Sequence, residues 1–251
     1  MTTTNAEPAV VSSLSTPTFP LGGRRRSPLA ATLRRRPREL LAVTLAGTLL
    51  GVVSLRVAGV GVAATAFAAH APTDALLLHE RPLRRLALEL EVAGAVGLFV
   101  GALATLSYAA RDHPNVRLRD GRGAFLLAAV AAVVGAAVGH AVGVGLVSDL
   151  VASGYVHADG VGGRYWLAEL AVTLPVVGGV ACGTPAAVAG AARASLVSRR
   201  WRSRDRGLAV LAAISFASVY SPPDSVTFVV AGGLLLAGLS LGLALVEFDL
   251  V

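Results

Sequence analysis

Long apolar runs separated by short polar segments divide this chain. Six runs cover Leu40–Ala69, Leu86–Ala110, Phe125–Val147, Trp166–Ala192, Leu208–Tyr220 and Val226–Val246. A helix needs about 20 apolar residues to cross a bilayer, and four of the runs exceed that length clearly. The pattern therefore predicts an all-α integral membrane protein with about six transmembrane helices.

The fifth run is the shortest, because it has only 13 residues. As a helix it would be about 20 Å long, which is marginal for a span by itself. The segment Ser221-Pro222-Pro223-Asp224 separates it from the sixth run. Two prolines cannot continue a helix, so Pro222, Pro223 and Asp224 are predicted to form the turn of a helical hairpin at the far membrane face.

The composition favours the same class. The chain is 55% hydrophobic and 15% charged, whereas an ordinary globular domain is about 25% charged. Only 5% of the residues are aromatic, so Ala, Val, Leu and Gly supply most of the apolar mass. Small residues let helices approach closely in lipid, and Gly135 and Gly139 form a small-xxx-small pair. A single cysteine, Cys182, excludes an internal disulfide.

The basic residues, which are all arginines, predict the orientation. Arg24–Arg38, Arg111–Arg122 and Arg193–Arg206 hold 17 of them, and the alternate loops hold four. By the positive-inside rule both termini and the basic loops are cytoplasmic. We expect residues 1–28 to be a disordered cytoplasmic tail and residues 29–251 to be the six-span domain. No aromatic interleaving or recognition fold accompanies the basic runs, so nucleic acid is not expected as a partner.

Five ionisable residues lie in or near the apolar runs: Arg56, Glu89, Glu91, His140 and Glu169. Each is costly in lipid unless it faces protein or water. For the two glutamates of the second run we expect interfacial ion pairs with the arginines just before them, and for Arg56 a side chain that reaches the outer surface. His140 and Glu169 could relay protons or form hydrogen bonds between spans. No nucleophile–base pair, metal-ligand spacing or phosphate loop stands out, so the sequence favours no enzyme, cofactor or metal.

The closing third of the chain carries an ordered set of motifs. They are Gly183-Thr184-Pro185, Ser195-Leu196-Val197-Ser198, Arg199–Arg206, the short fifth run, Ser221-Pro222-Pro223-Asp224 and Glu247. This order resembles the TatC family, the multispanning subunit of the twin-arginine protein translocase. In that family an acidic residue stands two before a proline of the fourth span. A loop and a basic stretch lead to a short span that ends in Thr-Pro-Pro-Asp, and the last span ends in an acid.

Two cytoplasmic segments extend the resemblance towards the N-terminus. Pro114–Arg122 has the spacing of the family's first loop, with Asp120 in the place of a glutamate. Thr32-Leu33-Arg34-Arg35-Arg36 matches the family's Glu-Leu-Arg-x-Arg tail except at the glutamate. The resemblance implies a signal-peptide site, for which the candidates are Leu33, Arg34, Arg36, Arg119 and Asp120.

The resemblance also implies a non-enzymatic function. TatC-like proteins lie in the cell membrane as multi-pass proteins, bind the paired arginines of signal peptides, and export folded cargo with small single-span Tat subunits and the proton gradient. A homo-oligomer is a further expected state. Guanidinium groups pair best with carboxylates, and this chain offers Glu39, Asp112 and Asp120 near the loops.

Two acidic positions of the family are replaced, one by Thr32 and one by Gly183. The chain could therefore be a degenerate scaffold paralogue, and Asp120 could be a solvated acid neutralised by Arg119 and Arg122. An unrelated small transporter or channel is another alternative. It would be expected to show internal repeats or matching broken spans, and none is found in the sequence.

Overall fold

The computed structural model describes residues 27–57, 82–152, 161–198, 201, 203–221 and 225–248. Over these residues the chain forms seven α-helices and no strand. The helices are α1 (Pro28–Arg35), α2 (Pro37–Val57), α5 (Pro82–Asp112), α6 (Leu118–Ala152), α7 (Val161–Arg193), α8 (Ser203–Tyr220) and α9 (Ser225–Glu247). The predicted all-α class is confirmed.

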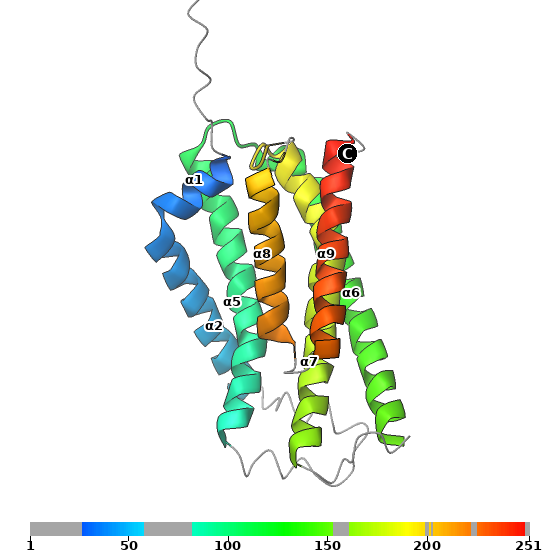
Figure 1. Cartoon of the computed structure of the whole chain (residues 1–251). Helices are drawn as coiled ribbons and strands as arrows, with labels where there is room; N and C mark the ends of the chain where they lie inside the picture. Colours follow the sequence, from blue (N-terminus) through cyan, green and yellow to red (C-terminus); the bar gives the residue numbers. More distant parts are fainter. Residues whose placement is uncertain are drawn as a thin grey trace, which may run out of the picture.

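The long helices form an up-and-down bundle (Figure 1). One end of it carries α1, the α5–α6 connection, the close of α7, the start of α8 and the close of α9. The described arginines of the three basic segments lie in these elements or in the adjoining ends of α2, α5 and α6, and we call this the arginine-rich end. Segments that are far apart in the sequence thus meet at the same face of the bundle.

Among the described residues, five helices have a stretch that is long and apolar enough to cross a membrane: all of α2, most of α5 and α7, the first part of α6, and all of α9. α8 is not among them, since its 18 residues begin with the charged turn of Arg204, Asp205 and Arg206. α2 is described as far as Val57, and the rest of the first apolar run lies outside the described residues.

Glycines bring α6 and α7 together along their length. An ideal Cβ atom on Gly135 would lie 2.4 Å from the Gly178 carbonyl oxygen, and one on Gly139 would lie 2.3 Å from that of Leu174. Neither position has room for a side chain. The predicted role of Gly135 and Gly139 in helix packing is confirmed.

The α8–α9 pair is anchored on α7. Thr173 of α7 is buried, and its hydroxyl donates a hydrogen bond to the carbonyl of Tyr220, the last residue of α8. The Tyr220 ring stacks on Phe216 one turn earlier. At the arginine-rich end, Arg206 forms an ion pair with Glu247. Pro222, Pro223 and Asp224 of the predicted turn lie outside the described residues.

The apolar side chains that are not buried between helices face the outside of the bundle. α6 shows this most clearly, because Leu127, Val130 and Val133 are each about 60–70% exposed. In water so large an apolar surface would be unfavourable, whereas lipid tails accept it. The exposed surface therefore agrees with a protein that lies in a membrane.

Candidate functional site

The junction of α1 and α2 shapes the arginine-rich end. Ser27 caps α1, since its hydroxyl accepts a hydrogen bond from the Ala30 amide. α1 ends before Arg36, whose backbone leaves the helix with φ −125° and ψ 42°. Pro37 begins α2, and a residue before proline is disfavoured in the α conformation. Arg36 is thereby held at a corner between two helices.

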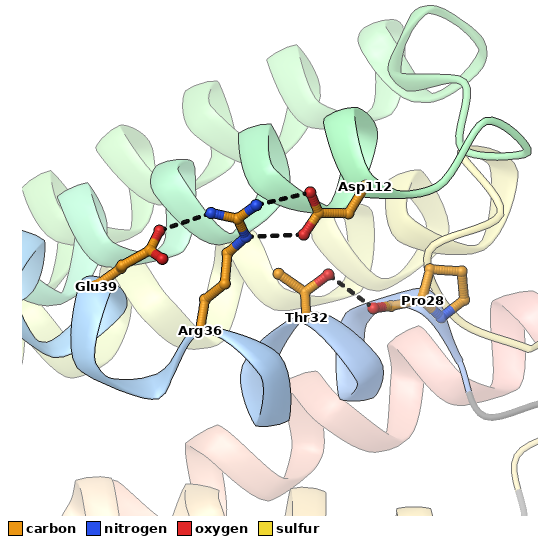
Figure 2. A network of polar contacts seen from close by, with 5 residues as sticks. All are labelled: Pro28, Thr32, Arg36, Glu39 and Asp112. Atoms are coloured by element: carbon orange, nitrogen blue, oxygen red, sulfur yellow. Dashed lines mark hydrogen bonds and ion pairs between the residues drawn. The ribbon is translucent and has the colours of Figure 1, made fainter.

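The Arg36 side chain contacts three partners, and Figure 2 shows two of them, Asp112 and Glu39. Its Nε and Nη2 donate to the two carboxylate oxygens of Asp112 over 2.8 and 3.0 Å. Its Nη1 donates to Glu39 over 2.8 Å. The guanidinium carbon lies 4.9 Å from the centre of the Tyr108 ring. A paired fork on one carboxylate, a second acid and an aromatic face are the contacts that suit a guanidinium group.

The contacts in this cluster favour the charged form of the Arg36 guanidinium group. The two hydrogen bonds to Asp112, and then the one to Glu39, raise the pKa of Arg36 above its ordinary value. The Asp112 side chain is 11% exposed and that of Arg36 is 28% exposed. The cluster is thus partly shielded and can still be reached from solvent.

The loop after α7 holds the other segments in place. The Leu29 amide of α1 donates to the Leu196 carbonyl, and the Arg117 amide donates to the Ala194 carbonyl, each over 3.2 Å. Leu196 itself is fully buried against Ala109 and Val116. Ser195 has a positive φ of 60°, which makes the tight turn there. The N-terminal helix, the first basic loop and the second basic loop therefore form one structural unit.

The five predicted signal-binding residues do not share one environment. Leu33 and Arg34 are exposed on α1, and Arg119 and Asp120 are exposed on the first turn of α6. Arg36 instead binds the protein's own acids. Within the described residues Asp120 forms no ion pair, so the structure shows no direct contact of its carboxylate with Arg119 or Arg122.

At the two positions where this chain lacks the family's acidic residues, Thr32 and Gly183 pack against neighbouring residues. Thr32 is fully buried, and its hydroxyl donates to the Pro28 carbonyl over 3.0 Å (Figure 2). Gly183 faces α6, where an ideal Cβ would lie 3.0 Å from the Ala128 carbonyl oxygen. Besides Pro185, α7 contains Pro175. The residue two positions before Pro175 is Thr173, so this proline is not preceded by an acid at that spacing either.

The ionisable residues of the apolar runs lie in different environments. Arg56 forms an ion pair with Glu89 over 3.2 Å, so this buried glutamate has a partner from α2. The side chains of the predicted partners Arg84 and Arg85 lie outside those that the structure describes. Glu91 is only partly buried, whereas Glu169 is buried in α7. His140 is exposed on α6 and makes no hydrogen bond within the described residues, so the prediction of a hydrogen bond between spans through His140 is wrong.

Sequence reasoning missed two features of this end. It placed Arg36 among residues that receive a peptide, and it gave Tyr108 no role. The signals were present, since Arg36 precedes a proline, Tyr108 lies in the last turn of the second apolar run, and Asp112 follows that run by two residues. An arginine fixed at a helix corner has a defined direction, but only the packing of α1 on α5 shows what it reaches.

Comparison with known proteins gives one match. The model of the family described as Sec-independent protein translocase protein (TatC) matches residues 30–232, which is most of the chain. No curated protein and no solved structure matches. The match spans most of α1, the two basic loops and the start of α8, all of which lie at the arginine-rich end, and it ends in the first part of α9. This chain therefore belongs to the TatC family and is a component of a Sec-independent protein translocase.

Proposed function

We propose that this protein binds twin-arginine signal peptides at its arginine-rich end, on the cytoplasmic side of the cell membrane. It passes folded cargo across that membrane with small single-span Tat subunits and the proton gradient. The single observation that carries the proposal is the meeting of α1, the first basic loop and the second basic loop around carboxylates. Family membership leaves the alternative of an unrelated transporter or channel without support.

The positive-inside rule supports the orientation. The described arginines of the three basic segments gather at one end, and the rule assigns such an end to the cytoplasm. This proposed orientation puts α1 and the end of α9 inside, since Glu247 closes α9 beside Arg206 at the same end. A signal peptide that has not yet crossed the membrane would reach this end first.

Asp120 supports the binding step. Its carboxylate is exposed at the start of α6 and makes no ion pair with a described residue. A carboxylate in this state is available to a guanidinium group in a charge-assisted pair. Its neighbours Arg119 and Arg122 oppose a cationic peptide, so the peptide's arginine must compete with their repulsion.

Crosslinking tests the proposal. The full-length protein in native membranes is exposed to a photoreactive peptide that carries Arg-Arg, and in parallel to a matched peptide that carries Lys-Lys. A bond to a charged group contributes about 1.5–3 kcal/mol, so Asp120→Asn should lower the arginine-dependent crosslink by about tenfold or more. Asp120→Glu should keep it.

Asp205→Asn is the control, because Asp205 is an exposed acid at the start of α8, at the same end of the bundle. It should change the crosslink little. A crosslink of equal yield with both peptides would contradict signal recognition by this chain.

A scaffold role is the second candidate. It is favoured by the burial of Thr32 and by the use of Glu39 and Asp112 as partners of Arg36. A scaffold would co-purify with single-span Tat subunits from native membranes and show no arginine-dependent crosslink. A signal receptor would show both.

A further inference from the structure

Asp112, Glu39 and Tyr108 form a cage around one guanidinium group, and we call it the guanidinium cage. Asp112 accepts two hydrogen bonds in parallel from Arg36, Glu39 accepts a third, and the Tyr108 ring lies 4.9 Å below the guanidinium carbon. The acids come from α2 and α5, and the ring comes one turn before Asp112. A lysine ammonium could not satisfy the planar fork of Asp112 in this way.

The occupant of the cage belongs to the chain's own arginine run. Arg36 is the last of three consecutive arginines, and Arg34 and Arg35 are exposed beside it. The run has the chemistry of the peptide ligand inferred above, two or more adjacent guanidinium groups. The occupied cage thus shows which ligand chemistry it accepts.

The position of Arg36 allows the occupant to leave. Arg36 is not helical, since it lies between the end of α1 and Pro37 at the start of α2. Its side chain is 28% exposed, so a competing guanidinium can approach from solvent. α1 would keep its attachment through the Leu29 amide and the Leu196 carbonyl.

We propose that the guanidinium cage is a binding site for an arginine of the cargo peptide, and that Arg36 fills it as an internal competitor. The proposal rests on the proposed function, since it adds a second arginine subsite to the one at Asp120. In the resting protein Arg36 closes the subsite and keeps Glu39 and Asp112 paired. A twin-arginine peptide displaces Arg36, whereas a peptide with a single arginine or with lysines does not.

Competition between Arg36 and the peptide for the guanidinium cage should change the apparent dissociation constant of the peptide. The apparent dissociation constant of a ligand rises in inverse proportion to the fraction of protein that is open to it. If Arg36 occupies the cage for about nine-tenths of the time, its removal should tighten peptide binding roughly tenfold. Arg36→Lys keeps the charge and loses the fork, so it should give a smaller gain.

The test is peptide binding by fluorescence anisotropy with the full-length protein in lipid nanodiscs. The probe is a labelled Arg-Arg peptide, and the Lys-Lys peptide is measured beside it. Arg36→Gln should tighten Arg-Arg binding roughly tenfold, and Arg38→Gln should change it by less than about twofold because an exposed charge in salt acts weakly. The double variant Arg36→Gln with Asp112→Asn should lose the gain. Should Arg36→Gln fail to accumulate, Arg36→Lys carries the test with a gain of about threefold.

A second measurement separates this inference from the proposed function. Methylguanidinium should raise the thermal stability of the Arg36→Gln protein, methylammonium should not, and the double variant should respond to neither. If wild type binds the Arg-Arg peptide through Asp120 but Arg36→Gln gives no gain, the internal competitor is refuted and the receptor stands. If methylguanidinium stabilises Arg36→Gln but no variant binds the peptide, the cage stands as a guanidinium site and the receptor function is refuted. An equal gain in the double variant, or no response to methylguanidinium, would overturn the cage itself.

Discussion

Thr173→Val tests how the α8–α9 pair is attached to the rest of the bundle. The hydroxyl of Thr173 donates to the carbonyl of Tyr220, and both residues are buried. Tyr220 ends α8, so its carbonyl has no partner from the regular helix pattern. Pro222 and Pro223 follow and carry no amide hydrogen. Valine keeps the shape of threonine and removes this donor.

The expected loss follows from that arrangement. An unsatisfied buried acceptor costs about 1–3 kcal/mol in soluble proteins. Hydrogen bonds between membrane helices contribute about 0.6 kcal/mol on average and up to about 1.7 kcal/mol. Because the Tyr220 carbonyl is buried at a helix end, we expect Thr173→Val to lower the free energy of unfolding by about 1 kcal/mol.

Thr184→Val supplies the matched control on the same helix. The Thr184 hydroxyl donates to the Val180 carbonyl four residues earlier, a carbonyl that the helix already satisfies. Its removal should cost less than about 0.5 kcal/mol. Reversible denaturation in mixed micelles measures both variants. Equal losses, or a neutral Thr173→Val, would refute the anchoring role of this hydrogen bond.

Three further predictions follow from the fold. Gly139→Leu should lower the free energy of unfolding by about 1–3 kcal/mol, because an ideal Cβ would already lie 2.3 Å from the Leu174 carbonyl oxygen. Gly123→Leu should not lower it, since nothing among the described residues lies within 4 Å of a Cβ at that position. Thermal denaturation in detergent compares the two variants. Replacing Pro222 and Pro223 with alanine should let α8 and α9 merge into one helix of about 45 residues, which is too long for the bilayer, and immunoblotting of membranes should show poor accumulation. Reporter fusions after Arg117 and Arg202 should be cytoplasmic and fusions after Asp159 and Asp224 external; an internal signal after Asp224 would contradict six spans.

The bundle could be predicted from sequence because lipid imposes a simple rule. Every span must satisfy its backbone internally and present apolar side chains outward, so the runs near α5, α6, α7 and α9 read directly as helices. The close approach at Gly135 and Gly139 was also readable, because small residues one turn apart on a helix have few other uses in lipid.

The contacts at the arginine-rich end could not be predicted in this way. Charge counts assign a side of the membrane, but they do not say which arginine meets which acid. The pairs of Arg36 with Asp112 and of Arg56 with Glu89 join residues that are far apart in the sequence, and each depends on how the helices pack. Thr32 and Gly183 illustrate the same limit, since the missing acids were visible in the sequence and the packing that now fills those positions was not.

Export of a reporter tests the central claim most directly. Cells in which this chain is the only TatC-family protein are given a folded fluorescent reporter behind a twin-arginine signal, or behind the same signal with both arginines changed to lysine. The account predicts that the twin-arginine reporter reaches the outer side of the membrane, that the lysine reporter stays inside, and that Asp120→Asn lowers export of the first. Retention of both reporters, with the single-span partners present and the protein at normal abundance, would contradict it.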